Sequence, residues 1–314
     1  MENEVMKSEL IAKRIAKNVE RIIVGRPKVI ELAVIALISE GHLLIEDVPG
    51  VGKTMLARSL AKSVSCDFKR IQFTPDMLPS DITGVTVYNQ KTGDFEFRQG
   101  PIMAQVVLAD EINRATPRVQ SALLECMDEK QVTVDGSTYK MPSPFHVIAT
   151  ENPYEYEGIF PLPETQLDRF ILRVSLGYPS LYEETLIMDR QQYRQPIEQL
   201  GAVCEASDLL MAQKTVKIIY VDDLVKEYIA SLVEATRNHS SIYLGASPRG
   251  SLALFRTAQA RALMQGRDFV LPDDVKTLAE SVLAHRLVLH GINGSKDGSG
   301  RSVIAEILET VPVP

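Results

Sequence analysis

Cysteine, histidine and tryptophan are scarce in this sequence, whose 314 residues contain three cysteines, five histidines and no tryptophan. Cys66, Cys126 and Cys204 are odd in number, and no two of them have the spacing of a metal-ligand or redox pair. The scattered histidines supply no zinc motif. These shortages exclude the small disulfide-rich and zinc-stabilised classes of protein, and they predict three reduced thiols in a protein core.

A long hydrophobic run is also missing. The longest apolar stretch, at residues 29–39, is interrupted by Glu31 and is too short to cross a bilayer. The first ten residues, MENEVMKSEL, are rich in charge and contain no apolar segment of the kind that a secretory signal requires. We therefore expect no membrane insertion and a cytoplasmic location.

Basic charge is not in excess, because the formal net charge at pH 7 is −7. A broad surface for nucleic acid needs the opposite balance, so nucleic acid is not an expected partner. One basic cluster lies near the N-terminus, at Lys13, Arg14, Lys17 and Arg21. Glu9 stands four residues before Lys13, which is the spacing of a stabilising helical ion pair, and we interpret the cluster as a solvated helix face.

The most informative segment is EDVPGVGKT, residues 46–54, in which a glycine-rich turn precedes a lysine and a threonine. An apolar run of strand type comes before this turn and a segment of helical periodicity follows it. In that context, backbone N–H groups around Gly50 and Gly52 would surround a β-phosphate, and Lys53 would reach the β- and γ-oxygens. The hydroxyl of Thr54 would coordinate Mg²⁺. The predicted nucleotide contacts in this segment are Pro49, Gly50, Val51, Gly52, Lys53, Thr54 and Met55.

A second segment, QVVLADE at residues 105–111, is a continuous apolar run that ends in two carboxylates. Strands of a parallel sheet that is covered on both faces have this composition, and they present functional groups at their carboxyl ends. Asp110 would hold Mg²⁺ directly or through a water, and Glu111 would orient and deprotonate the attacking water. The alternatives are a chance Gly-Lys-Thr in an ordinary turn, where Asp47 replaces the glycine of the general pattern, and a pair of acids that opens a solvated loop.

Three more residues are candidates for contact with a phosphate. Asn152 ends the apolar run VIATENP, where its amide would hold the attacking water, although Asn-Pro also initiates turns. Arg169 stands at an expected helix end, where it would either reach a neighbouring subunit's γ-phosphate or complement the helix dipole. Arg249 lies in the first turn of a helix after Pro248, where a cation is unfavourable without an anion nearby.

The order of these segments resembles an AAA+ ATPase, and it closely resembles the MoxR family over nearly the whole chain. The resemblance implies an α/β fold with a P-loop AAA+ core, in which helices flank a parallel sheet, and a small C-terminal all-helical lid. Asp110 and Glu111 are then the Walker B pair, Asn152 is sensor 1, Arg169 is the arginine finger and Arg249 is sensor 2. The segments that carry the resemblance are EDVPGVGKT, VVLADEINRA, PRVQSALLECMDE, ATENP, LPETQLDRF, SPRG and ILETVPVP.

The resemblance also bears on the base and on the phosphate loop. Ile23, Val24 and Gly25 match the family's stretch beside the adenine, although Arg26 stands where a glutamine is usual, which leaves the base specificity open. Asp47 is itself usual in this family. The implied cofactors are ATP and Mg²⁺.

Two segments alternate apolar and polar residues on both sides of a turn, which is the pattern of a β-hairpin. Residues 85–100 turn at Lys-Thr-Gly, and residues 132–141 turn at Asp135-Gly136. They resemble the helix-2 insert and the pre-sensor-1 hairpin that group MoxR proteins with magnesium chelatase subunits and replicative helicase relatives. In those relatives the hairpins face the pore or partners; surface hairpins without such a role are the alternative.

Length and composition fit two domains in one chain. Pro179 cannot continue a strand, and Ser180 can cap a helix that follows. The Gly/Ser-rich stretch at residues 292–302 is expected to form a loop of the lid. The expected divisions are an ATPase core at residues 1–178, a linker at 179–206 and a lid at 207–314.

The resemblance implies hydrolysis of MgATP at the subunit interfaces of a ring, which is hexameric in the family. Arg169 would act on a neighbour's nucleotide, and Arg249 would carry the state of the γ-phosphate to the lid. The implied biological role is chaperone-like remodelling or maturation of a protein client, together with a partner that contains a von Willebrand factor A domain.

Three alternatives stay open at this point. A magnesium chelatase-like ATPase subunit is the nearest of them. A DNA-dependent motor of the helicase-related branch would need basic hairpins, whereas these carry Tyr88, Phe95 and Phe97 with few basic residues. A nucleotide-gated scaffold with little turnover is disfavoured by Glu111 and Arg169.

Overall fold

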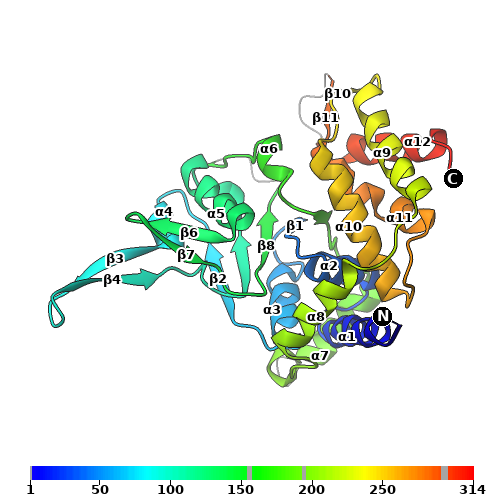
Figure 1. The fold of residues 1–314 in the computed structure, drawn as a ribbon. Coiled ribbons are helices and arrows are strands. Elements are labelled where there is room, and N and C mark those ends of the chain that lie inside the picture. Colours follow the sequence, from blue (N-terminus) through cyan, green and yellow to red (C-terminus); the bar gives the residue numbers. More distant parts are fainter. Residues whose placement is uncertain (1, 154–157, 193–195, 291–295) are drawn as a thin grey trace.

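The computed structural model describes residues 2–153, 158–192, 196–290 and 296–314. A five-stranded sheet forms the centre of the core, with the strand order β2-β5-β8-β1-β9 and parallel pairing throughout (Figure 1). The predicted apolar runs form its buried inner strands, as expected for a sheet that is covered on both faces. The strand bounds are β1 Leu43–Glu46, β2 Phe68–Gln72, β5 Val106–Asp110, β8 His146–Glu151 and β9 Leu172–Val174.

Helices cover both faces of this sheet. One face packs on α2, α3 and the lid, with α1 packed on α2 and α3, and the other face packs on α5 and the small helix α4. Pro27, Pro79 and Pro117 each occupy the start of a helix, where the missing N–H has no intrahelical partner to lose. The bounds are α1 Glu2–Glu20, α2 Pro27–Ile38, α3 Lys53–Ser63, α4 Pro79–Thr83, η1 Ile112–Arg114, α5 Pro117–Glu129 and α6 Glu164–Leu167.

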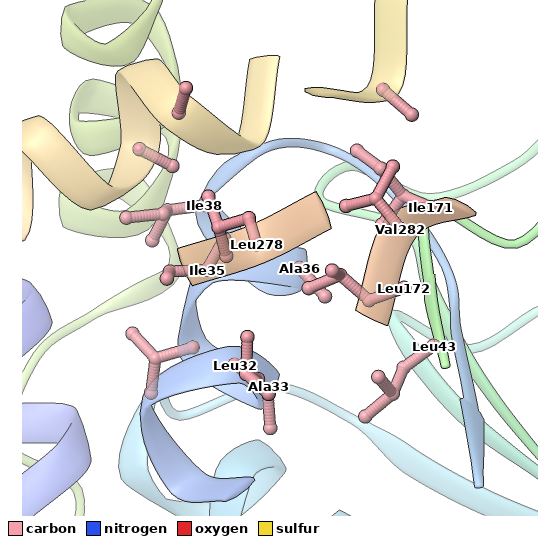
Figure 2. Close-up of a cluster of buried hydrophobic side chains, with 14 of the residues drawn as sticks. Leu32, Ala33, Ile35, Ala36, Ile38, Leu43, Ile171, Leu172, Leu278 and Val282 are labelled. Atoms are coloured by element: carbon pink, nitrogen blue, oxygen red, sulfur yellow. The ribbon is translucent and has the colours of Figure 1, made fainter. Parts of the chain in front are cut away.

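The core and the lid share one hydrophobic cluster. Helix α2 is apolar around most of its circumference and packs both on β9 of the sheet and on lid helix α10 (Pro248–Met264). Lid helix α11 (Pro272–Leu283) packs directly on β9 as well, and Figure 2 shows side chains of α2, α11 and the sheet in this one cluster. Burial of this kind contributes about 25 cal/mol for each Å² of apolar surface, so it stabilises the lid against the core.

The C-terminal part is helical as predicted, with one addition. Strands β10 (Ile242–Leu244) and β11 (Val288–Leu289) pair antiparallel, so the lid is not all-helical. The expectation of a loop at residues 292–302 was wrong from Lys296 onward, because α12 begins there and its buried Val303, Ile304 and Ile307 anchor it; residues 291–295 lie outside the described part. The helices are α8 Ala206–Val216, α9 Asp223–Asn238, α10 Pro248–Met264, α11 Pro272–Leu283, η3 Ala284–Arg286 and α12 Lys296–Thr310.

The stretch predicted as a linker holds helix α7 (Leu181–Gln191) and the short η2 (Pro196–Gln199). Ser180 caps α7 as expected, because its side chain accepts a hydrogen bond from the backbone N–H of Glu183 at 3.4 Å. The domain divisions at residues 178 and 206 stay predictions. In the described part of the chain, no helix combines the length and the apolar character that crossing a membrane requires.

Both predicted hairpins are present. Strands β3 (Gly84–Asn89) and β4 (Asp94–Gln99) turn through Gly93 at φ +78°, and they project far from the body of the molecule (Figure 1). Strands β6 (Gln131–Val134) and β7 (Ser137–Lys140) turn through Asp135 and Gly136, which both have positive φ. The rings of Phe97 and Tyr139 stack with centroids 4.0 Å apart, so the hairpins support each other.

The three cysteines are free thiols, as predicted. Cys126 and Cys204 are buried, and burial raises the pKa of each thiol to about 12. Cys66 is only partly buried, and burial raises the pKa of its thiol to about 11. None of them is a thiolate at neutral pH, which fits a packing role.

Two buried histidines hold the amino-terminal edge of the sheet. The Val147 N–H donates to Nδ1 of His42 at 3.0 Å, so Nε2 of that ring carries the proton toward the Met127 carbonyl at 3.3 Å. His146 Nδ1 lies 2.7 Å from the Gly41 carbonyl, which can only accept. Burial lowers the pKa of His42 to about 3 and that of His146 to about 4, so both rings are neutral in the folded protein.

These two histidines predict a loss of stability in mild acid. The unfolded chain binds protons on them near pH 6.5 and the folded chain does not, so the free energy of unfolding falls as pH drops from about 6.5 toward 4. The slope is about 1.4 kcal/mol per pH unit for each histidine. Urea unfolding at several pH values measures it, and His42→Gln should flatten the slope by one histidine's share. An unchanged slope in His42→Gln would contradict the assignment.

Candidate active site at the carboxyl edge of the sheet

The glycine-rich loop joins Glu46, the last residue of β1, to Lys53, the first residue of α3. Gly50 and Gly52 have φ of +88° and +100°, which a residue with a side chain rarely adopts. A Cβ at Gly50 would have no neighbour within 4 Å, and one at Gly52 would meet only Ile23, at 3.9 Å. The loop therefore encloses open space at the N-terminus of a helix, which fits a bound phosphate. The predicted contacts from Pro49 to Met55 all lie in this loop and in the first turn of α3.

Lys53 points back into the site. Its side chain is buried, and Nζ donates to the backbone carbonyls of Asp47 at 2.8 Å and of Glu151 at 3.4 Å. Burial lowers the pKa of the ammonium, and the nearby carboxylates of Asp110, Asp47 and Glu111 raise it in part. A cation in the first turn of a helix is also repelled by the helix dipole. A bound phosphate would therefore offset both the burial of the positive charge and this repulsion.

The two predicted carboxylates come together at the end of β5. Asp110 Oδ2 accepts hydrogen bonds from Arg70 at 2.7 and 2.9 Å, and its Oδ1 accepts one from the Thr150 hydroxyl at 2.6 Å. The same hydroxyl accepts from the backbone N–H of Glu111 at 2.8 Å. Thr150 thus ties β8 to both acids. Glu111 has φ +58°, a sparsely populated conformation for a residue with a side chain, and strain of this kind often accompanies function.

Strand β2 holds the Glu111 side chain. Its Oε2 accepts from Gln72 at 2.9 Å and lies 3.2 Å from Nη1 of Arg114. Arg70 and Gln72 are two residues apart on β2, so both face the same side, toward the acids that end β5. The sequence prediction missed both residues. Their signal was the triplet Arg70-Ile71-Gln72, in which two polar residues flank an apolar one and therefore lie on the same face of a strand.

Asn152 and the stretch at Ile23 complete this edge. Asn152 follows β8 and is buried, and its carbonyl accepts a hydrogen bond from Asn113 at 3.1 Å. Ile23 is buried, and its Cδ1 atom lies 3.9 Å from the point where a Cβ at Gly52 would sit. The side chain therefore packs against the phosphate loop. Gly25 has φ +71°, and the Glu183 carboxylate occupies the space where a side chain would lie. The structure therefore gathers the predicted loop, Walker B, sensor 1 and adenine-side residues at one edge.

Arg169 lies at the opposite edge. It precedes β9, and the N–H of Ile171 donates to the carbonyl of His42, the residue before β1, at 2.9 Å. The Nε atom of Arg169 is 3.2 Å from Asp128 Oδ2, and Nη2 of Arg249 is 3.3 Å from the same oxygen. The four residues of β1 span about 13 Å, so neither arginine faces the phosphate loop of its own chain. The two predicted arginines are thus adjacent to each other and separate from the other predicted residues.

A buried ion pair fixes this arrangement. Arg286 is almost fully buried, and its Nε donates to Asp168 Oδ1 at 2.9 Å. Burial lowers the pKa of the guanidinium to about 10, and the Asp168 carboxylate opposes part of this shift. Asp168 Oδ2 also accepts from the Ser247 hydroxyl at 2.7 Å, and Ser247 caps the helix that carries Arg249. Arg169 follows Asp168 directly. The sequence prediction missed Asp168, Arg286 and Asp128.

A phosphate loop after β1, two acids at the end of β5 and a sensor strand between them define a P-loop ATPase of the AAA+ class, completed by a helical lid. The family model described as "ATPase family associated with various cellular activities (AAA)" matches residues 42–172, and the AAA lid domain model matches residues 234–307.

Individual proteins place the chain within that class. It is 43% identical to chaperone MoxR1 of Mycobacterium tuberculosis over 94% of this chain and 80% of the relative, and 51% identical to the uncharacterized YeaC of Bacillus subtilis over 95% and 93%. A crystal structure of a proposed ATPase from Cytophaga hutchinsonii covers 100% of this chain and 98% of its own, with a TM-score of 0.92 and 39% identity. The chain belongs to the MoxR family of AAA+ ATPases.

The bridge made by Thr150 yields a prediction about turnover. Thr150→Val keeps the shape of the side chain and removes the hydroxyl that joins Asp110 to the Glu111 N–H, so this partly buried amide loses its partner. We expect kcat to fall about tenfold with nucleotide affinity changed less than about threefold. Steady-state phosphate release and nucleotide titration measure the two quantities. Thr133→Val, on an exposed hairpin strand, is the matched control, and equal kcat in both variants would refute the role of the bridge.

Proposed function

We propose that the protein hydrolyses MgATP at the interface between two subunits of a ring. The observation that carries this proposal is the separation of the nucleotide-binding residues from Arg169 and Arg249 by the depth of the sheet. A site built this way is complete only where the arginine edge of one subunit meets the phosphate-loop edge of another. A closed ring, hexameric by family resemblance, repeats that contact without leaving an open end.

Within one subunit, Lys53 and the loop amides bind the phosphates, and Thr54 and Asp110 hold the metal. Mg²⁺, when bound, neutralises phosphate charge. Glu111 accepts the proton of the attacking water, and Asn152 orients that water. Gln72 and Arg114 both contact Oε2 of Glu111, and these contacts orient the carboxylate.

From the neighbouring subunit, Arg169 and Arg249 stabilise the charge that develops on the transferred phosphoryl group. The sequence prediction assigned only Arg169 to the neighbour. The contact of both arginines with Asp128 supports placing Arg249 in the same role, and Arg249 would then link the lid of one subunit to the nucleotide of the next. Asp128 holds the pair until a more negative partner replaces it.

Mixing two inactive variants tests the shared site. Arg169→Ala keeps the phosphate loop, and Lys53→Ala keeps the arginines. Each alone should lose about a thousandfold in kcat, whereas an equal mixture should recover about a quarter of the wild-type rate, because a quarter of the random interfaces are intact. Arg249→Ala mixed with Lys53→Ala should recover in the same way. Arg118→Ala, an exposed arginine on α5, is the control and should keep full activity. Mixtures that stay inactive would place the arginines in their own subunit's site.

We further propose that hydrolysis drives chaperone-like maturation of a protein client in the cytoplasm, with a von Willebrand factor A domain protein as the partner. The name of the relative MoxR1 and the projecting hairpin support this proposal. Exposed Tyr88 and Phe95 pair on that hairpin with centroids 5.3 Å apart. The charges near them are balanced, since Lys91 and Arg98 accompany Asp94 and Glu96, and this balance favours a protein client over DNA.

Capture from native lysate tests the biological role. Glu111→Gln protein should bind ATP without turning it over, and should retain a protein with an adhesion-type metal site when ATP is present. Lys53→Ala protein is the control and should retain nothing in an ATP-dependent manner. The retained protein, once purified, should stimulate ATP hydrolysis by the wild type. Retention and stimulation by DNA instead would select the motor function.

A further inference from the structure

The turn at residues 175–178 is held by side chains from two distant parts of the chain. It follows β9, where the chain leaves the sheet, and it leads through α7 toward the lid. Asp47 Oδ2 accepts hydrogen bonds from the N–H groups of Leu176 at 2.6 Å and Gly177 at 2.8 Å, and from the Ser175 hydroxyl at 3.0 Å. One buried carboxylate oxygen therefore binds three donors of the turn.

Arg26 binds the carbonyl groups of the same turn. Its guanidinium donates to the Leu176 carbonyl through Nε and to the Tyr178 carbonyl through Nη2 at 2.5 Å. Its Nη1 lies 3.0 Å from Glu183 Oε2, at the start of α7. The planar fork of an arginine suits this arrangement, because it can serve several acceptors in fixed directions, which a glutamine cannot. We refer to Asp47 and Arg26 together as the linker clamp.

Asp47 also belongs to the nucleotide site. Its backbone carbonyl accepts from Lys53 Nζ at 2.8 Å, and its N–H donates to the Glu151 carbonyl at 3.1 Å. Its Oδ1 accepts from the N–H of Val48 at 2.9 Å. The general phosphate loop has a glycine at this position, and a glycine has no side chain with which to reach the turn.

Arg26 is connected to the same site through its neighbours. Ile23, three residues earlier, packs against the Gly52 position of the phosphate loop. Gly25 leaves the space that Glu183 fills, so the segment before Arg26 contacts both the loop and α7. Asp47 therefore contacts both Lys53 of the phosphate loop and the turn, whereas Arg26 contacts the turn directly and is linked to the loop through Ile23.

We propose that Asp47 and Arg26 are positioning residues that transmit the state of the phosphate loop to the chain that carries the lid. When Lys53 exchanges the Asp47 carbonyl for a phosphate, the backbone of Asp47 loses a contact while its carboxylate keeps the turn. The turn, and the lid beyond it, then follow the loop. The linker clamp acts inside one subunit, so it goes beyond the shared site proposed above and stands whether or not a ring forms.

Amide hydrogen exchange tests the clamp directly. In the wild-type protein, peptides covering residues 172–181 should be protected, and ADP or a non-hydrolysable ATP analogue should change that protection. In Asp47→Gly, which restores the general glycine, the same peptides should exchange about tenfold faster and ignore nucleotide, because the turn amides have lost their acceptor. Peptides covering residues 48–56 should still respond to nucleotide. We expect kcat to fall about tenfold and KM to change less than about threefold.

Arg26→Ala supplies a second test that leaves the phosphate loop intact, and it decides the matter if Asp47→Gly fails to fold. In Arg26→Ala, peptides covering residues 172–181 should also exchange faster and no longer respond to nucleotide. Arg26→Lys should restore part of the nucleotide response. Arg21→Ala removes a nearby exposed charge and should behave as the wild type. The proposal is overturned if the turn of either variant stays protected and responsive, or if Asp47→Gly loses the nucleotide response of its phosphate loop, since Asp47 would then belong to the binding site alone.

Discussion

Parallel pairing of five short strands is the constraint on which the rest of this molecule depends. Since all strands point the same way, the loops that follow them meet at one edge and the segments that precede them meet at the other. The phosphate loop, both acids and Asn152 follow strands, whereas Arg169 precedes one. The direction of the chain thus separates binding groups from the arginines, and the four residues of β1 set the distance between them.

Buried polar contacts then join the lid to each edge. At the amino edge, Asp168 binds Arg286 and Ser247 of the lid, which places Arg249 beside Arg169. Arg286 is buried and Asp168 is partly buried, so loss of the carboxylate would leave an uncompensated buried charge on Arg286. At the carboxyl edge, Asp47 holds the turn that leads to the lid. Each edge therefore has one aspartate, which binds the lid itself at the amino edge and the chain that leads to the lid at the carboxyl edge.

The sequence was sufficient for the residues whose type and position carry chemistry. The spacing of Gly50, Gly52 and Lys53 correctly predicted a loop between a strand and a helix, and the apolar runs before Asp110 and Asn152 correctly predicted inner strands. It was not sufficient for contacts that depend on strand order. Nothing local to Arg70 or Gln72 says that β2 lies next to β5, and nothing local to Asp47 says that β9 lies next to β1. The β10–β11 ribbon escaped prediction because its strands are two and three residues long.

The strand order also explains how the two hairpins are connected to the two acids. β2 is an edge strand that binds Asp110 and Glu111 through Arg70 and Gln72. The same strand continues through α4 into the β3–β4 hairpin, and this hairpin stacks on the second one through Phe97 and Tyr139.

The second hairpin in turn follows α5, whose last turn carries Asp128, the partner of the two arginines. The β3–β4 hairpin is therefore connected to Glu111 through α4 and β2, and to Asp128 and the two arginines through the second hairpin and α5. Because the acids end β5 and β2 lies next to β5, this connection depends on the strand order of the sheet.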